Sequence, residues 1–173
     1  MRRGIAGPAP ALLFVLFLWP VVANADGLFV ETGPGISHSN GSFAMFMRYQ
    51  RDAPALFGRA SFYEVSYGSW SGSNRNEALA LARGIVWPSG EDGYVSFEAG
   101  LGRVRTTTGN LDTLMEILLR AAYGRRIGRL DISLGFTHFS NGKKLLRNIY
   151  PPWWEHGPNF GEYFTTLQLG VTF

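Results

Sequence analysis

The chain has 173 residues, of which 46% are hydrophobic, 17% are charged and none is cysteine. This length allows one domain, and the lack of cysteine excludes disulfide bonds, metal sites with cysteine ligands and a lipidated N-terminal cysteine. The 16 basic and 13 acidic residues include Arg2 and Arg3 at the N-terminus. Without these two arginines the charges almost balance, so the composition gives no support for a nucleic-acid partner.

The N-terminus has the layout of a secretory signal peptide. The two arginines precede an apolar run from Ala9 to Val22, and the small-residue sequence Ala-Asn-Ala ends at Ala25. The run is interrupted by proline and is shorter than the roughly 20 apolar residues that a membrane-spanning helix needs. We therefore predict a signal peptide over residues 1–25, cleaved after Ala25, and export of residues 26–173.

The exported part consists of short segments of alternating polarity, separated by clusters of glycine, proline, asparagine, aspartate and serine. Such segments predict β-strands joined by turns. In chain order, the predicted strands are 27–36, 42–50, 59–70, 77–88, 94–105, 113–124, 130–139 and 163–173. An even number of strands is typical of single-chain outer-membrane barrels.

Alternation is clearest in the last predicted strand, where one face carries Tyr163, Thr165, Leu167, Leu169, Val171 and Phe173. The opposite faces of the predicted strands carry glycine and charges of both signs, namely Glu31, Arg48, Glu64, Glu98, Glu116 and Arg120. A soluble sandwich would show the same local alternation. Opposite charges suit a closed, paired interior, however, and aromatic residues cluster near the strand ends as in interfacial girdles. The last strand also ends in Phe173, like the C-terminal signal of outer-membrane barrels.

We therefore predict an all-β fold, an eight-stranded antiparallel transmembrane β-barrel over residues 26–173 in the bacterial outer membrane. Eight strands give an interior that side chains fill, so we expect no channel. With both termini in the periplasm, the turns near 51–58, 89–93 and 125–129 face the periplasm. The loops near 37–41, 71–76, 106–112 and 140–162 then face the outside.

The seventh predicted strand carries two polar residues where its alternation predicts lipid-facing ones. His138 and Ser140 have the same parity as the apolar residues before them, so both point outward, about 7 Å apart along the strand. An imidazole can activate a serine hydroxyl when a carboxylate orients the ring. Glu162 precedes the antiparallel neighbour of this strand and is the first candidate for that carboxylate, although simple alternation turns it inward unless a bulge or turn intervenes. Glu155 is the alternative.

Two sequence stretches resemble the lipid A 3-O-deacylase (PagL-like) family of eight-stranded outer-membrane enzymes. These are His138-Phe139-Ser140-Asn141-Gly142 and Gly157-Pro158-Asn159-Phe160-Gly161-Glu162-Tyr163. The resemblance implies His138 as base, Ser140 as nucleophile and Glu162 as orienting acid, with Asn141 and Asn159 as candidates for holding the oxyanion. It also implies hydrolysis of the 3-O-linked 3-hydroxyacyl chain of lipid A without a metal or other cofactor. Residues 151–156 look like an insertion into the family's pattern.

The implied partners are lipid A or lipopolysaccharide and the surrounding outer-membrane lipid, and a homodimer is left open. Candidate contacts to the lipid A phosphates are Arg103 and Arg105, on the outward parity of the fifth predicted strand, and Lys143 and Lys144 in the last loop. Two other interpretations compete with the esterase. One is a non-enzymatic barrel of the adhesin or surface-protection type. The other is a lipid-binding or palmitoyl-transferring barrel, which needs an apolar interior cavity.

Overall fold

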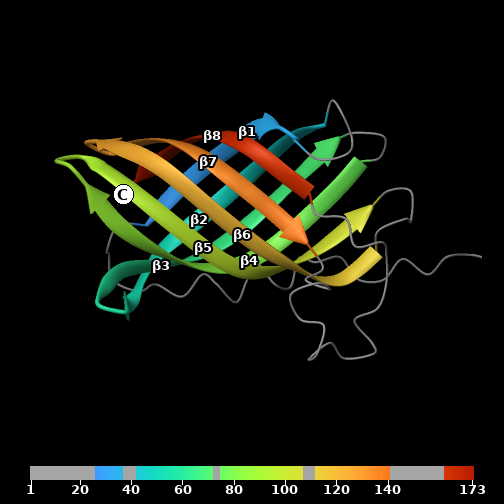
Figure 1. Cartoon of the computed structure of the whole chain (residues 1–173), viewed down its shortest axis with the longest axis horizontal. Coiled ribbons are helices and arrows are strands. Elements are labelled where there is room, and N and C mark those ends of the chain that lie inside the picture. Colours follow the sequence, from blue (N-terminus) through green and yellow to red (C-terminus); the bar gives the residue numbers. More distant parts are fainter. Residues whose placement is uncertain (1–25, 37–41, 72–74, 107–111, 141–161) are drawn as a thin grey trace, which may run out of the picture.

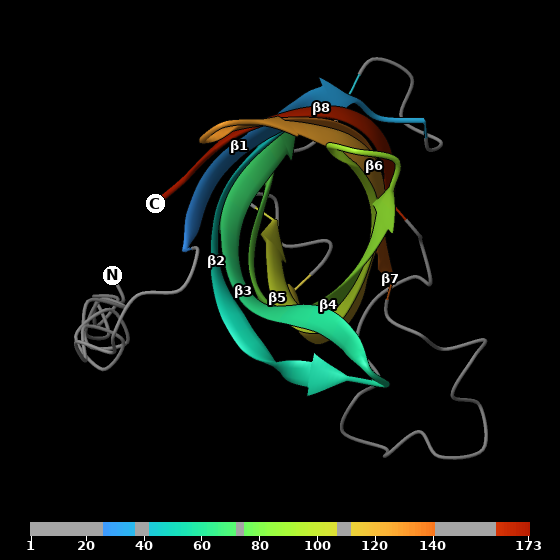
Figure 2. The same ribbon diagram turned by 90° about the vertical axis from the view of Figure 1, so that its left-hand side faces the viewer.

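The computed structural model describes residues 26–36, 42–71, 75–106, 112–140 and 162–173. They form a closed antiparallel barrel in which each strand pairs with the next along the chain and the last pairs with the first (Figures 1 and 2). The strands are β1 Gly27–Pro34, β2 Phe43–Leu56, β3 Arg59–Ser71, β4 Arg75–Ser89, β5 Gly93–Thr106, β6 Asp112–Ile127, β7 Leu130–Ser140 and β8 Glu162–Thr172. The predicted fold class is thereby confirmed. The predicted signal peptide, residues 1–25, lies outside the described residues.

Short turns mark one end of the barrel. The start of β1 and the end of β8 lie at this same end, since Gly27 pairs with Thr172. We take this as the periplasmic end, because outer-membrane barrels have short periplasmic turns and longer extracellular loops. No helix in the described part of the chain is long and apolar enough to cross a membrane.

The β2–β3 hairpin is longer than its sequence predicts. The run 51–58 reads as a turn because it contains Asp52, Pro54 and Gly58, yet β2 continues to Leu56. The actual turn is Phe57-Gly58, with φ of 52° and 71°, as a two-residue hairpin turn requires. A register shift between Ala53 and Leu56 accommodates the proline, which strands tolerate at such irregularities. This end of the hairpin curls away from the barrel wall (Figures 1 and 2).

The outer wall is apolar and aromatic. Side chains on the outward parity are exposed along every strand, among them Leu28, Met45, Met47, Tyr67, Leu81, Phe97, Tyr123, Leu134, Leu169 and Val171. A water-soluble protein does not expose a continuous apolar surface of this kind. The wall instead matches the hydrocarbon core of a membrane.

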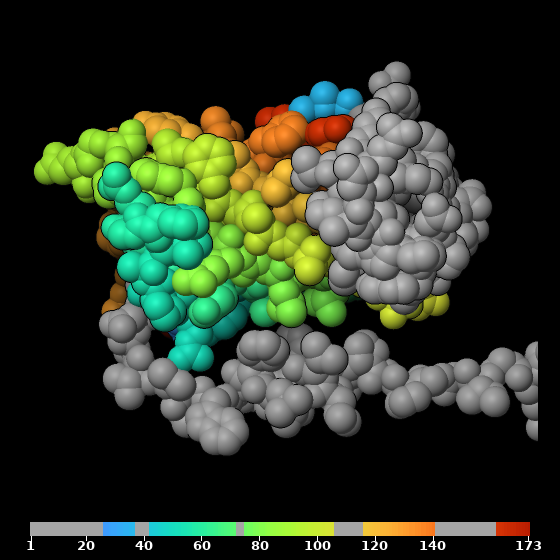
Figure 3. All heavy atoms as spheres, turned by 60° about the horizontal axis from the view of Figure 1, so that its bottom comes forward, coloured from blue at the N-terminus to red at the C-terminus, as the bar shows by residue number. Residues whose placement is uncertain are grey.

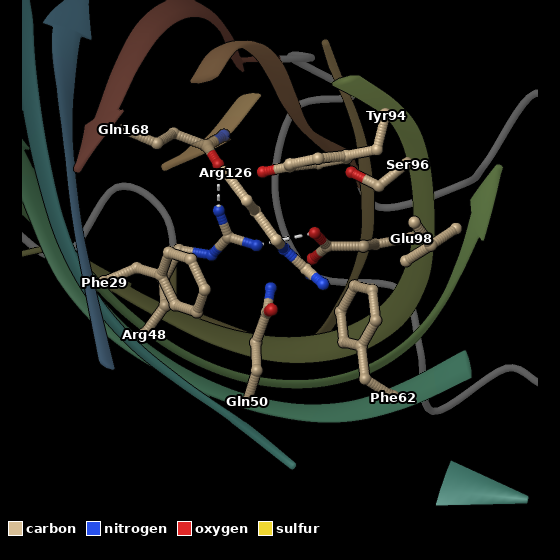
Figure 4. A pocket seen from close by; sticks show the side chains of 10 residues that line it. Phe29, Arg48, Gln50, Phe62, Tyr94, Ser96, Glu98, Arg126 and Gln168 are labelled. Carbon is tan, nitrogen blue, oxygen red and sulfur yellow. Dashed lines mark hydrogen bonds and ion pairs between the residues drawn. The ribbon is translucent and has the colours of Figure 1, made fainter. Parts of the chain in front are cut away.

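A layer of buried charges fills the middle of the interior. Arg48 donates to Glu64 from Nε at 2.8 Å, and Arg120 Nη1 lies 2.8 Å from Glu98 Oε2. Arg120 Nε lies 3.0 Å from Glu31 Oε2. Three carboxylates thus face two guanidinium groups, which leaves one negative charge in excess. The Glu31 carboxylate also accepts hydrogen bonds from the hydroxyls of Thr137 and Thr166. Figure 4 shows Arg48 reaching from its strand to Glu98 on one side and Gln168 on the other.

An aromatic layer lies between these charges and the extracellular end. Phe46, Trp70, Phe139 and Phe164 pack with ring centroids 5.4–6.1 Å apart. Small residues face them from β4, where Ala78 and Ala80 are 2% exposed. Together the two layers fill the interior with side chains, as expected for eight strands.

Candidate active site

Strand β7 presents His138 and Ser140 on the outer wall. Its residues alternate between exposed and buried from Leu130 to Phe139, and His138 and Ser140 fall on the outward parity, both partly exposed. Their inward neighbours Thr137 and Phe139 are buried in the two interior layers. The imidazole and the hydroxyl therefore share the outward parity of β7.

The His138 ring is held by β8. Tyr163 lies directly opposite in the β7–β8 ladder, and the two rings stack with centroids 4.3 Å apart and planes 18° apart. His138 Nδ1 lies 3.2 Å from the main-chain oxygen of Glu162. Because a carbonyl oxygen only accepts hydrogen bonds, Nδ1 carries the hydrogen in the neutral ring. Nε2 is then the nitrogen with a free lone pair, which is what a general base needs.

Glu162 takes a different position from the one expected of an orienting carboxylate. It is the first residue of β8 and pairs with Phe139, and the β7–β8 register runs on without a shift to Leu130. The bulge or turn that would bring its side chain to the outer face is therefore not formed, and Glu162 has the inward parity of Phe164. Glu162 contacts the His138 ring through its main-chain oxygen.

Ser140 is the last residue of β7 and lies at the extracellular edge of the apolar wall. It pairs with Ile117 of β6, which in turn pairs with Leu101 of β5. One step toward the periplasm, His138 has Leu119 as its β6 neighbour. Ser140 and His138 thus border a patch of aliphatic side chains that lipid acyl chains would cover.

Arg103 and Arg105 lie on the same wall and at the same end. Both are exposed on the outward parity of β5, where Arg103 pairs with Leu79 and Arg105 with Glu77. Since Leu101 and Ser140 are separated by two strand-to-strand steps, these arginines stand about 10 Å around the barrel from the serine. Their predicted contact with phosphate stays a prediction.

The remaining predicted site residues lie outside the described part of the chain. They are Asn141, Asn159, Lys143, Lys144, the alternative acid Glu155 and the insertion at residues 151–156. Tyr163 was missed as a site residue. Its role depends on the register of β7 against β8, and the long segment that connects the two strands does not fix that register in the sequence.

No family model matches the chain, and no curated protein is significantly similar to it. Solved structures do match. The crystal structure of the outer membrane enzyme PagL has a TM-score of 0.59 at 14% identity, over 84% of this chain and 98% of that one. Neisserial surface protein A (NspA) has a TM-score of 0.61 at 10% identity, over 87% and 100%. The outer membrane protein Ail of Yersinia pestis has a TM-score of 0.51 at 8% identity, over 87% and 100%.

These likenesses concern the fold alone, because all three identities are low. They show a small barrel of the kind found in bacterial outer membranes, and they support the same location for this chain. One neighbour is named an enzyme and the others are not, so the fold leaves the activity undecided. Any statement of activity has to come from the side chains of the wall.

Proposed function

We propose that the protein is an outer-membrane esterase that removes the 3-O-linked 3-hydroxyacyl chain of lipid A, with Ser140 as nucleophile and His138 as base. The observation that carries the proposal is the outward-facing His138, whose Nδ1 is hydrogen-bonded to the Glu162 carbonyl, with Ser140 two residues further on the same face. Polar side chains on a lipid-facing wall are costly and are usually functional.

The arrangement supports acyl transfer through serine. The Ser140 hydroxyl gives its proton to His138 Nε2 while Oγ attacks the ester carbonyl of the acyl chain. The imidazolium then protonates the departing sugar oxygen, which leaves the acyl group on Ser140. A water molecule, deprotonated by the same nitrogen, hydrolyses this ester and releases a 3-hydroxy fatty acid. In both steps the Glu162 carbonyl accepts a hydrogen bond from Nδ1–H and stabilises the positive ring.

The position of the site fits a substrate that stays in the membrane. The acyl chains of lipid A lie in the outer leaflet, so they reach an outward-facing serine by lateral diffusion along the wall. Leu101, Ile117 and Leu119 provide aliphatic surface next to the site. Arg103 and Arg105 supply positive charge at the height of the sugar phosphates, a role that we also propose for Lys143 and Lys144.

The remaining roles complete the proposal. Asn141 and Asn159 are the candidate donors to the oxyanion. Glu155 is the candidate carboxylate of the triad, because the side chain of Glu162 has the inward parity. Glu162 contributes its main-chain contact with the His138 ring.

Mass spectrometry of lipid A from cells that express the protein tests the proposal. Wild-type protein is expected to yield lipid A lacking one 3-hydroxyacyl chain, and Ser140→Ala is expected to restore that chain completely. Thr165→Ala is the matched control, because it also removes a hydroxyl from the outer wall, on β8, and is expected to leave the product unchanged. Equal lipid A from wild type and Ser140→Ala, with both proteins folded in the outer membrane, would contradict the esterase.

The main alternative is a surface-exposed barrel without enzymatic activity. The fold is equally compatible with it, since the barrel also resembles Neisserial surface protein A at a TM-score of 0.61. In that case lipid A is unchanged by wild-type protein. A barrel that holds an acyl chain inside needs an apolar cavity, and the interior here holds the charged and aromatic layers instead.

A further inference from the structure

Two arginines and a tyrosine form a row on the lipid-facing wall toward the periplasmic end. Arg51 of β2 pairs with Tyr63 of β3, and Tyr63 pairs with Arg83 of β4. All three have the outward parity, and Tyr63 is 49% exposed. Arginine on a lipid-facing wall is expensive unless its guanidinium reaches the interface and finds partners there.

Arg83 reaches the interface by way of the β2–β3 hairpin. Its guanidinium carbon lies 5.2 Å from the centre of the Tyr63 ring. Nη2 donates to the Pro54 carbonyl at 2.8 Å and lies 3.5 Å from the Ser61 hydroxyl. Pro54 belongs to the end of the β2–β3 hairpin that extends away from the barrel wall. Figure 3 shows this end of the hairpin as a teal protrusion. Both hydrogen bonds start from Nη2, one nitrogen of a guanidinium group that has five N–H donors.

Arg51 and Arg83 differ from two other arginines at the periplasmic end, which have acidic partners. Arg125 lies 3.1 Å from Asp92 and Arg126 lies 3.1 Å from Asp131. Within the described residues, no carboxylate lies at ion-pair distance from Arg51 or Arg83. Both arginines lie on a wall whose other surroundings are lipid, so the natural counter-charge is a lipid phosphate.

We propose that Arg51, Tyr63 and Arg83 form a binding site for the phosphate of an anionic phospholipid, such as phosphatidylglycerol, in the periplasmic leaflet. The two guanidinium groups flank the tyrosine and offer planar pairs of N–H donors, the geometry that suits phosphate oxygens. The Tyr63 hydroxyl is a further donor, and the acyl chains follow the apolar wall of β2 to β4. The site is independent of the esterase, which faces the opposite leaflet.

Native mass spectrometry of the purified protein in mild detergent tests this site. The protein is titrated with dipalmitoyl phosphatidylglycerol, and with the zwitterionic phosphatidylethanolamine of the same chain length. We expect stronger retention of phosphatidylglycerol, and a loss of about fivefold in its apparent affinity for each of Arg51→Gln and Arg83→Gln. Arg125→Gln is the matched control, because Arg125 is an exposed arginine of the same end that already has Asp92 as partner. It is expected to bind like wild type.

Several outcomes would overturn the site. They are equal retention of both lipids, an unchanged affinity in Arg51→Gln, or an equal loss in Arg125→Gln, which would show charge attraction without a site. Arg51→Gln leaves the hydrogen bonds of Arg83 to the hairpin intact, so its result holds even if Arg83→Gln fails to fold. Adding excess inorganic phosphate to the lipid-bound protein tests whether the site binds a lipid phosphate or a free phosphate ion. Displacement of the lipid by this ion would assign the site to a free anion and contradict the lipid.

Discussion

Replacing Arg120 by methionine tests whether the buried charges hold the barrel together. The Arg120 side chain is fully buried, 3.0 Å from Glu31 and 2.8 Å from Glu98, and it also pairs with Glu64. Methionine fills much of the same volume without strain, so the main change is the loss of one positive charge. Three glutamates would then face Arg48 alone.

The expected cost follows from this imbalance. Removing one partner from a buried ion pair destabilises a protein by about 3–5 kcal/mol, because the remaining charges stay buried without compensation. Arg125→Met provides the comparison, since the Arg125 side chain is 68% exposed beside Asp92. An exposed pair of this kind contributes about 0–1 kcal/mol.

Urea-induced unfolding in lipid vesicles, followed by tryptophan fluorescence, measures both changes in the free energy of unfolding. A second variant, Arg120→Met with Glu98→Gln, removes one negative charge as well and is expected to recover part of the loss. If Arg120→Met and Arg125→Met cost the same, or if the second substitution makes the protein less stable still, the layer of buried charges does not stabilise the barrel as argued.

Two further predictions concern the candidate active site. Tyr163→Leu removes the ring stacked on His138, a contact worth about 1 kcal/mol. We therefore expect kcat/KM for lipid A deacylation to fall about fivefold while the barrel stays folded. Unchanged kinetics would show that the stack does not position the base. Glu162→Gln keeps the main-chain carbonyl that accepts the hydrogen bond from His138 Nδ1. The loss in kcat should therefore stay at about tenfold. Altering the acid of a serine triad costs roughly 10⁴-fold, which is far more. A loss of that larger size would show that the Glu162 carboxylate itself orients the ring.

The strand alternation allowed most of the barrel to be predicted from the sequence. Glu31, Arg48, Glu64, Glu98 and Arg120 were all assigned to the inner face, and all are buried. The two-residue period is a local property of a strand, so it can be seen in one segment at a time. For the same reason the alternation alone predicts that His138 and Ser140 share the outward parity of β7, without the strand pairing.

Features that depend on pairing between strands were not predictable in this way. The extension of β2 to Leu56 comes from its pairing with Arg59, which overrides the turn signals of Asp52 and Pro54. The main-chain contact of Glu162 with His138 depends on the register of β8, which places Tyr163 opposite the histidine. Sequence reasoning identified Glu162 as a partner of the ring, but it assigned that role to the carboxylate.

Strand alternation also couples the candidate site to the interior. Phe139 and Phe164 are the inward neighbours of His138 and Tyr163 along their strands. Phe139 stacks on Phe46 with ring centroids 5.8 Å apart, and Phe164 meets Trp70 edge to face at 5.4 Å. The packed rings fix the backbone of β7 and β8, and so they fix the outward side chains too. In the proposed function, such a wall holds the base and the nucleophile rigidly beside the acyl chain. We then expect selection among lipids to depend on the groups at the rim that meet the head group, such as Arg103 and Arg105.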